Sequence, residues 1–294
     1  MVQQKGKGEI AFRVINSFVM LLIVAVTLYP LLYVLAVSLS SAEYVQARMV
    51  TIFPRGFNVD AYRQVMSDTY FWSSYKNTIV YTVTGTVLSL FLTTMLAYCL
   101  SRPNLFARKQ LSFLILFTMF FSGGLVPNFL LVKQLHLYNT IWAIILPTGI
   151  STYNMIVTRT YMQGLPEELF ESVKLDGGND WQIFTRIVLP LSKPVVATIA
   201  LFYAVGLWNG YFNPMIYLKD ADKYPLQIIL KDLILSQNAS DLSGGASEAL
   251  GQSMMTSEMI ISASIIIAMI PILCVYPFIQ KYFVKGVMLG AVKG

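Results

Sequence analysis

The sequence predicts an all-α membrane protein with six transmembrane helices. Of its 294 residues, 56% are hydrophobic and only 12% are charged, and six long apolar runs contain no Asp, Glu, Lys or Arg. A soluble domain carries about 25% charged residues, because polar side chains must cover its surface. The low charge also excludes a disordered chain and a coiled coil, since both need many polar residues.

Each apolar run is long enough to cross a bilayer as a helix. A helix rises about 1.5 Å per residue, so about 20 residues cross a hydrocarbon core about 30 Å thick. Helices are expected because each one satisfies its backbone hydrogen bonds within a single segment. Within a single transmembrane domain of residues 1–294, the predicted spans are about 14–39, 77–100, 110–132, 138–158, 194–218 and 259–280.

Helix-breaking residues lie inside several of these spans. The third span contains Ser122–Gly124 and Pro127, the fourth contains Pro147, and the fifth contains Pro214. Because proline in a lipid-embedded helix is usually only a kink, each run is still expected to form one span.

The Lys and Arg residues of the connections indicate the orientation. The side that holds both termini carries thirteen of the 21 Lys and Arg residues, and the other side carries eight. The cytoplasmic side of a membrane protein is the more basic one, so both termini are expected in the cytoplasm. The net charge of +6 is then a signal of topology, and nucleic-acid binding is not expected.

The residues needed for catalysis or ion coupling are missing. Carriers driven by protons or sodium keep an ionisable group inside the bilayer, and none of the six runs contains one. One histidine, His136, and two distant cysteines, Cys99 and Cys274, cannot form a zinc, redox or nucleophilic centre. No Gly-Lys-Ser or Gly-Lys-Thr phosphate loop occurs. We therefore expect a chain that is not an enzyme, holds no cofactor and receives its energy from another chain.

A long cytoplasmic connection, residues 159–193, contains a predicted helix–turn–helix. Pro166 with Glu167 and Glu168 is typical of a helix start, and Leu169, Phe170 and Val173 follow as an apolar stripe. Asp176-Gly177-Gly178 predicts a tight turn, because glycine readily adopts a positive φ.

The second helix of this connection begins after the turn. Either Asn179 or Asp180 is expected to cap it, with Trp181 and Phe184 on its apolar stripe. Pro190 is expected to end it, and Pro194 to open the fifth span. Two apolar faces exposed in the cytoplasm indicate either an element resting on lipid headgroups or one that docks a protein.

The same connection carries a spaced motif. It reads Glu171-Ser172-Val173, Asp176-Gly177-Gly178, Phe184, Ile187 and Pro190. This is similar to the loop shared by permease subunits of bacterial ABC importers, whose pattern is Glu-Ala-Ala, two residues, Asp-Gly-Ala and then a spaced Phe, Ile and Pro. Ser172, Val173 and Gly178 depart from the alanines of that family. The resemblance favours protein docking over the lipid surface.

Other segments narrow the resemblance to carbohydrate importers. Asn77-Thr78, and Phe53-Pro54 before it, look like the approach to the second span of sugar-importer permeases, and Trp208-Asn209 looks like their fifth span. The tail from Val284 to Gly294 is similar to the ending of the smaller maltose-importer permease. The resemblance implies a MalG-like subunit with the type I ABC importer fold and a cytoplasmic coupling helix, in a bacterial cytoplasmic membrane.

The resemblance also implies partners and a coupling site. A second homologous permease, two ATPase subunits that bind ATP and Mg, and an extracytoplasmic sugar-binding protein would complete an importer of oligosaccharides. The residues implied to couple to the ATPase are Leu169, Phe170, Glu171, Val173, Asp176, Gly177, Trp181, Phe184 and Pro190. In MalG-like subunits the last outer loop, here about 219–258, reaches into the binding protein, which implies contacts at Gln237, Asn238, Gly244 and Gly245.

The sequence also contains candidate residues for a solute path, and it leaves two alternative functions open. Tyr203, Trp208, Asn209, Tyr211 and Asn213 combine aromatic rings that stack on sugars with amide groups, although such a stripe is also typical of packing. The stretch Ser236–Gly251 is expected to be a mobile loop, with or without a role. A peptide or amino-acid importer permease would share the coupling loop, and a membrane scaffold or sensor could dock a cytoplasmic partner without moving solute.

Overall fold

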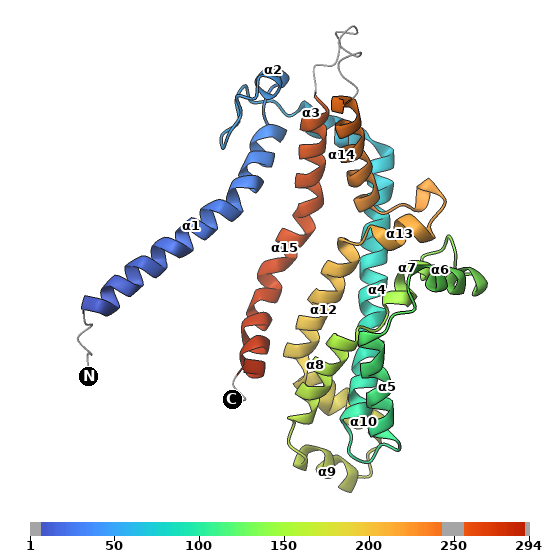
Figure 1. Ribbon diagram of the computed structural model, residues 1–294. Helices are drawn as coiled ribbons and strands as arrows, with labels where there is room; N and C mark the ends of the chain where they lie inside the picture. The colour runs from blue at the N-terminus through green and yellow to red at the C-terminus, as the bar shows by residue number, and fades with distance from the viewer. Residues whose placement is uncertain (1–6, 243–255, 292–294) are drawn as a thin grey trace. The chain divides into compact units, whose positions relative to one another are not determined.

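The computed structural model describes residues 7–242 and 256–291 of the chain, which form helices joined by turns and short connections (Figure 1). Contacts between Cα atoms divide the chain into two compact units. The first unit consists of residues Met1–Thr69 and Leu230–Met269, and the second of Tyr70–Ile229 and Ile270–Gly294. Two long helices, α14 (Leu226–Leu242) and α15 (Ser257–Ala291), contribute residues to both units.

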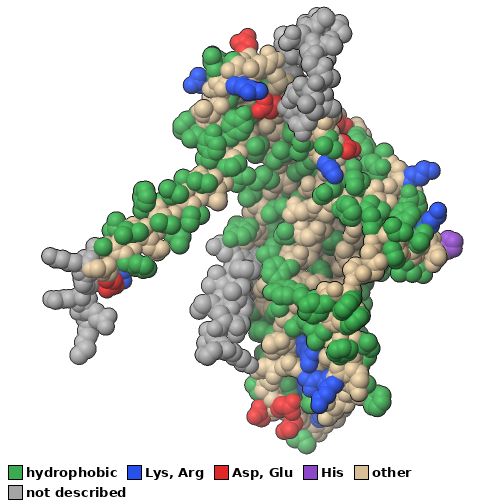
Figure 2. Space-filling model, viewed as in Figure 1, with side chains coloured by type: hydrophobic (Ala, Val, Ile, Leu, Met, Phe, Trp, Pro, Cys, Tyr) green, Lys and Arg blue, Asp and Glu red, His purple; other side chains and the backbone are tan. Residues whose placement is uncertain are grey.

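The first unit begins with a long helix, α1 (Lys7–Ser38), followed by α2 (Ala42–Gln46) and α3 (Asp60–Ser67). Hydrophobic side chains cover α1 along its length, and none of its most apolar stretch is buried inside the chain (Figure 2). Such a surface is stable in lipid or against another subunit, and in water it is not. Near the C-terminal end of α1, Tyr33 donates a hydrogen bond to Glu258 Oε1 at 3.1 Å, which ties α1 to the start of α15.

The second unit is a bundle whose longest helix is α4 (Thr69–Ser101). Its other elements, in order, are α5 (Arg108–Phe120), α6 (Leu125–Gln134), α7 (Trp142–Ile145), η1 (Leu146–Thr148), α8 (Thr152–Gln163), α9 (Glu168–Leu175), α10 (Asp180–Ile183), the π-helical turn η2 (Phe184–Val188), α11 (Leu189–Leu191), α12 (Lys193–Trp208), α13 (Phe212–Tyr217) and η3 (Ala221–Lys223).

The third and fourth predicted spans are interrupted, and do not form continuous helices. α5 and α6 meet at an angle of 116°, and Gly124 between them has a φ of +84°, which favours glycine. The fourth predicted span consists of α7, η1 and α8, and α8 starts afresh at Ser151, whose Oγ accepts a hydrogen bond from the Asn154 N–H. Among the described residues, three helices are long and apolar enough to cross a membrane, or up to five when each bent pair is one span.

The sequence predicted that Pro190 ends the second helix of this connection, but helical structure continues past Pro190. Helical structure continues from α10 through the π-turn η2 and α11 to Leu191, and then bends by 81° into α12. Proline is accepted because it occupies the first turn of α11, where a backbone N–H is not required. Pro194 lies in the first turn of α12, so it does open the fifth span as expected.

Part of the predicted outer loop is helical. α14 runs to Leu242, so Ser236–Leu242 forms its last turns, and a mobile loop was the wrong prediction there. Ala and Leu in this polar stretch have high helix propensity, which outweighs the Ser and Asn residues next to an established helix. The rest of that predicted loop, residues 243–251, lies outside the described residues.

Among the described residues, two apolar clusters pack the elements of the second unit against one another. One joins α4 and α8 to the cytoplasmic connection, and its buried members are Ala97, Tyr98, Leu100, Met155, Met162, Phe170, Ile183, Phe184 and Val188. The other lies around α6, α7 and α13 and contains Tyr81, Val132, Ala143, Ile144, Tyr217 and Leu218. Each large side chain buried in this way stabilises the fold by about 1.5–3 kcal/mol.

Candidate functional site

The long connection of residues 159–193 contains a helical hairpin formed by α9 and α10. The Gly178 N–H donates to Val173 O at 2.8 Å and the Gly177 N–H donates to Lys174 O at 3.0 Å, with a φ of +76° at Gly177. These are the paired bonds of a Schellman C-cap, which ends α9 and reverses the chain. The sequence therefore predicted the turn correctly.

The second helix of the hairpin is capped by Asn179, which resolves the choice between Asn179 and Asp180. Asn179 Oδ1 accepts a hydrogen bond from the Gln182 N–H at 2.9 Å, and Gln182 Oε1 accepts one from the Asn179 N–H at 3.0 Å. This reciprocal capping box stabilises a helix start by about 1 kcal/mol. Both ends of the turn between α9 and α10 are thus fixed by local hydrogen bonds.

Two of the predicted coupling residues are buried against this chain itself. Phe170 is 5% exposed and Phe184 is 3% exposed, and both belong to the cluster that includes Tyr98 of α4. The Tyr98 and Phe184 rings lie with their centroids 5.2 Å apart. These two phenylalanines therefore attach the hairpin to the bundle, and their rings are not free to enter a groove of another protein.

Arg102 contacts the same aromatic rings where the hairpin packs against α4. The guanidinium carbon of Arg102, just beyond the end of α4, lies 3.6 Å from the centroid of the Phe170 ring and 5.3 Å from that of Tyr98. Arg102 Nε is buried and has no hydrogen-bond partner among the described residues, and the guanidinium group lies against two aromatic faces that attract a cation. Sequence reasoning missed Arg102, because no local pattern links it to residues nearly seventy positions later.

The rest of the hairpin presents an exposed face. Trp181 is 55% exposed and Leu175, which the sequence analysis did not select, is 88% exposed. The other predicted coupling residues divide between exposed positions, at Glu171, Asp176, Gly177 and Pro190, and half-buried ones, at Leu169 and Val173. An exposed indole and an exposed leucine therefore lie among carboxylates at the tip of the unit (Figures 1 and 2).

The five candidate path residues divide by exposure. Tyr203 is buried, and its hydroxyl accepts a hydrogen bond from the Ser151 N–H at 2.8 Å and lies 2.6 Å from Thr93 Oγ1. Trp208 is 6% exposed and packs edge-on against Tyr75, with ring centroids 5.9 Å apart. Both side chains are therefore packed within their own chain.

The remaining three candidates lie at the break between α12 and α13. Asn209 and Tyr211 are exposed, and Asn213 lines a cavity of about 50 Å³ with Thr78, Tyr81 and Thr148. The interruption of the helix leaves hydroxyl and amide groups facing this small space. Asn209, Tyr211 and Asn213 are thus the members of the set whose side chains are not buried.

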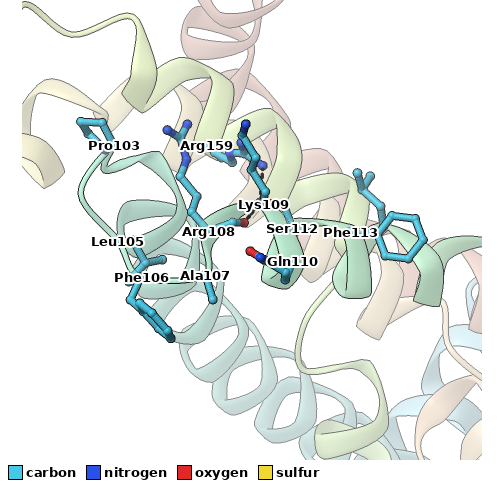
Figure 3. A pocket seen from close by; sticks show the side chains of 11 residues that line it. Pro103, Leu105, Phe106, Ala107, Arg108, Lys109, Gln110, Ser112, Phe113 and Arg159 are labelled. Carbon is cyan, nitrogen blue, oxygen red and sulfur yellow. Dashed lines mark hydrogen bonds between the residues drawn. The ribbon is translucent and has the colours of Figure 1, made fainter.

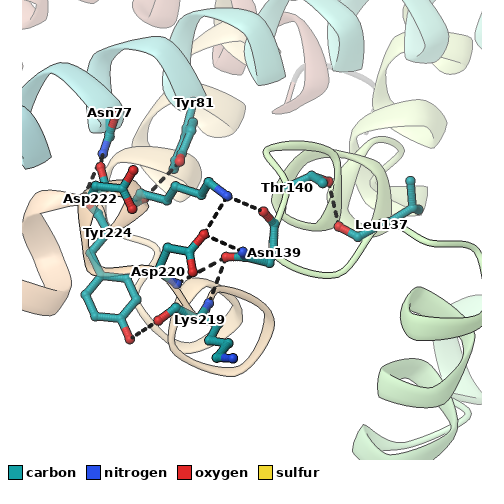
Figure 4. A network of polar contacts seen from close by, with 10 residues as sticks. Asn77, Tyr81, Leu137, Asn139, Thr140, Lys219, Asp220, Asp222 and Tyr224 are labelled. Carbon is teal, nitrogen blue, oxygen red and sulfur yellow. Dashed lines mark hydrogen bonds and ion pairs between the residues drawn. The ribbon is translucent and has the colours of Figure 1, made fainter.

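A polar clasp joins the connection between α6 and α7 to the connection between α13 and α14 (Figure 4). Asn139 Nδ2 donates to Asp220 Oδ2 at 2.6 Å, Asn139 Oδ1 accepts from the Lys219 and Asp220 N–H groups, and Lys223 Nζ donates to Asn139 O and Asp220 Oδ2. The hydrogen bonds from Lys223 and Asn139 lower the pKa of Asp220 below its ordinary value of 3.8. Tyr81 donates to Lys223 O at 2.8 Å, which ties the clasp to α4.

The four residues expected to contact a binding protein lie where the structure gives no side-chain contacts. Gln237 and Asn238 lie in the last turns of α14, where side chains are not described, and Gly244 and Gly245 lie outside the described residues. Within residues 7–242 and 256–291, no group of three or more His, Cys, Asp or Glu residues is placed to hold a metal ion.

The sequence matches known proteins over most of its length. It is 43% identical over 275 residues to the polygalacturonan/rhamnogalacturonan transport system permease protein YtcP of Bacillus subtilis, covering 94% of this chain and 96% of that protein. It is also 43% identical over 270 residues to the protein LplC of Bacillus subtilis, covering 92% of this chain and 90% of that one. The permease AraQ of arabinooligosaccharide transport in Bacillus subtilis is 28% identical over 288 residues, which cover 96% of both chains.

The fold matches solved transporters. A chain of a bacterial ABC transporter involved in the import of the acidic polysaccharide alginate superposes with a TM-score of 0.88 at 35% identity, covering 96% of this chain and 100% of that one. A chain of the alginate ABC transporter in complex with an alginate pentasaccharide-bound periplasmic protein shares the fold at a TM-score of 0.55 and 17% identity, covering 91% and 93%.

The family follows from a match to residues 78–289, which extends from the N-terminal part of α4 into the final helix and contains the hairpin and the α12–α13 break. The protein is accordingly a transporter permease subunit and not an enzyme. Its fold is that of a type I ABC importer permease, and its apolar helices are those of a membrane protein. The chain belongs to the family of binding-protein-dependent transport system inner membrane components.

Proposed function

We propose that this chain is the transmembrane subunit of an ATP-driven importer that moves acidic oligosaccharides delivered by an extracytoplasmic binding protein. The observation that carries this proposal is the TM-score of 0.88 over 96% of the chain with the transporter for the acidic polysaccharide alginate. The 43% identity to a permease named for polygalacturonan and rhamnogalacturonan, polysaccharides that contain the acidic sugar galacturonate, supports the same substrate class. These names favour a sugar over the peptide or amino-acid alternative.

The proposed driving force comes from separate subunits. Two ATPase subunits would bind ATP and Mg, and a second homologous permease would complete the translocation path. In this arrangement both termini lie in the cytoplasm, as the distribution of Lys and Arg suggests. No ATP-binding loop is present in the sequence, which supports an energy source outside this chain.

The hairpin of α9 and α10 is the proposed contact with the ATPase. Exposed Leu175 and Trp181 would enter the partner, while buried Phe170 and Phe184 carry its motion to α4 and α8. A lever of this kind needs a tip that binds and a base that does not yield. The Schellman turn and the capping box make the tip rigid.

Solute would pass the break between α12 and α13. Asn209, Tyr211 and Asn213 are the proposed path residues, since amide groups and a phenol ring bind sugar hydroxyls and faces. The outer loop would contact the binding protein through Gln237, Asn238, Gly244 and Gly245.

The test is to co-express the chain with its neighbouring genes and reconstitute the complex in lipid. We expect ATP hydrolysis to rise when the binding protein is loaded with an oligogalacturonide, and to stay basal with a neutral maltooligosaccharide as the control. Stimulation by the neutral sugar alone would contradict the acidic substrate. Stimulation by peptides would favour a peptide or amino-acid importer. If no solute is transported, the alternative of a membrane scaffold or sensor would be favoured.

The coupling contact is tested in the same preparation. Leu175→Ala with Trp181→Ala should leave basal hydrolysis and assembly of the membrane subunits intact while reducing stimulation at least about tenfold, because two apolar anchors of roughly 1.5–3 kcal/mol each are lost. Leu135→Ala is the matched control, since Leu135 is 57% exposed at the end of α6 and away from the hairpin. Normal stimulation of the double variant would exclude this face as the docking surface.

A further inference from the structure

A second surface feature of the bundle is a basic pocket between α5 and α8. The pocket has a volume of about 710 Å³, and Figure 3 shows Arg108, Lys109 and Arg159 among the eleven residues that line it. No carboxylate is among those eleven residues. In the described chain, none of the three cations takes part in an ion pair.

The arginines are held in place by neutral groups. Arg159 Nη1 donates to Ser112 Oγ at 3.1 Å, and Arg108 Nε donates to Leu100 O at 2.9 Å. Arg159 lies beyond the predicted fourth span, and burial together with the charge of Arg108 lowers its pKa. Two guanidinium groups fixed near each other without an acid repel, so an anion between them would lower the free energy of the site.

The end of a helix adds to the positive potential. α5 begins at Arg108, so its first N–H groups and the positive end of its dipole lie at the same pocket. Helix starts favour anions because the first N–H groups have no acceptor within the helix. Glu167 lines an adjoining cavity with Arg102 and Arg108, on the side of the hairpin, and is not part of this pocket.

Apolar side chains continue from the cations along α5. Phe106 is 90% exposed, Phe113 is 67% exposed and Leu116 is 39% exposed, and all three line the pocket. Leu116 lies eight residues beyond Arg108, or about 12 Å along the helix. A free phosphate would account for the cations but would leave these side chains exposed. A molecule with an anionic head and an apolar tail accounts for both.

The position of the pocket indicates that a lipid of the bilayer, and not the ATPase, fills it. The lining residues run up α5, whereas the exposed tip of the hairpin at α9 lies past the lower end of α8 (Figure 1). Basic pockets next to membrane helices on the cytoplasmic side are recurring sites for anionic headgroups. We propose that the pocket formed by Arg108, Lys109 and Arg159 binds the phosphate of an anionic phospholipid, whose acyl chains lie against Phe113 and Leu116.

The test uses the purified complex and measures lipid retention by native mass spectrometry. Phosphatidylglycerol and phosphatidylcholine with identical acyl chains are compared. We expect selective retention of phosphatidylglycerol, reduced about fivefold by Lys109→Gln and further by adding Arg159→Gln. Lys109 is exposed and forms no hydrogen bond or ion pair with the described residues, so its loss should not affect folding. Arg159→Lys should retain the lipid.

Lys133→Gln is the matched control, because Lys133 is also exposed but lies on α6 outside the pocket. Retention that is equal in the control and in the Lys109→Gln, Arg159→Gln variant would overturn the proposal. So would full displacement of phosphatidylglycerol by millimolar inorganic phosphate, which would identify a simple anion site. Selective retention only after removal of the ATPase subunits would show that a protein covers the pocket, and would also overturn it.

Discussion

The guanidinium group of Arg102 lies 3.6 Å from the centre of the Phe170 ring and links the end of α4 to the first helix of the cytoplasmic hairpin. Arg102 and Phe170 are 68 positions apart in the sequence, so this contact depends on the tertiary fold. If the hairpin receives force from the ATPase, the force reaches α4 through this contact and the surrounding aromatic rings.

Arg102→Ala should therefore loosen the base of the hairpin. A partly desolvated cation–π contact contributes about 1–2 kcal/mol, so the midpoint of thermal unfolding should fall by a few degrees. Sugar-stimulated ATP hydrolysis should fall more than basal hydrolysis. Arg102→Lys keeps the charge and should recover part of both losses. Equal effects of the Ala and Lys variants would mean that packing, and not the cation, is what matters.

Gly177 is the second position where the hairpin depends on one residue. Its φ of +76° is strained for any side chain, so Gly177→Ala should cost about 1 kcal/mol, although a Cβ there would meet no atom within 4 Å. Gly177→Pro should be worse, since proline fixes φ near −65° and removes the N–H that bonds Lys174 O. The measurement is sugar-stimulated ATP hydrolysis with thermal unfolding of the complex.

Gly164→Ala is the control for that pair. Gly164 lies in the same connection but has a φ of −85°, and a Cβ would make only an ordinary contact at 3.4 Å with Tyr161 O. It should therefore couple normally. If Gly164→Ala and Gly177→Ala behave alike, the positive φ is not the cause.

The membrane character and the hairpin could be predicted from the sequence because both are local. Long charge-free runs predicted α1, α4, α12 and α15, and Asp-Gly-Gly with Asn179 predicted the turn and its cap. The bend at Gly124 could not be predicted, since composition does not separate a kink from a break. α14 was missed in part because its polar end reads as a loop when its helical neighbours are unknown.

The candidate site was predicted by position more than by role. An apolar stripe shows which side of a helix is buried but not what covers it, so Phe170 and Phe184 were assigned to a partner although they pack on their own chain. Tyr203 was a path candidate because aromatic rings stack on sugars, and the sequence could not show that its hydroxyl contacts Thr93 and Ser151. Arg102 and Asn139 act on residues far away in the sequence, and no single-sequence pattern reports such contacts.

The clasp at Asn139 should depend on both its side chain and its backbone. Asn139 has a φ of +62°, which asparagine tolerates better than most residues. Asn139→Gly keeps that conformation and loses the side-chain bonds to Lys219 and Asp220, whereas Asn139→Ala also adds strain. Thermal unfolding should rank wild type above Gly and Gly above Ala. A Gly variant as stable as wild type would mean that the side-chain bonds contribute nothing.

The stability that the clasp contributes should depend on pH, because Asp220 is titratable. Its pKa is lowered in the folded chain by hydrogen bonds from Lys223 and Asn139, so the charged form stabilises the fold. That contribution is present above the ordinary value of 3.8 and is lost as the pH falls through the lowered pKa. The stability difference between wild type and Asp220→Asn should be constant near neutral pH and shrink below about pH 4. A constant difference down to lower pH would contradict this role.

Tyr203 should prove structural, in contrast to Asn209. The Tyr203 hydroxyl is the acceptor for the Ser151 N–H at the start of α8, and it bonds Thr93 of α4. Tyr203→Phe leaves these buried groups without a partner, which costs about 1–3 kcal/mol. Thermal stability should therefore fall. The concentration of sugar-loaded binding protein that gives half-maximal stimulation of ATP hydrolysis should stay unchanged.

Tyr153→Phe is the control, because Tyr153 is 56% exposed on α8 and its hydroxyl bonds none of the described residues. Asn209→Ala should show the opposite pattern, with stability retained and transport of sugar reduced, because its side chain is exposed and forms no hydrogen bond with the described residues. Altered substrate preference in Tyr203→Phe would return that residue to the path and would show that its hydrogen bonds open during transport.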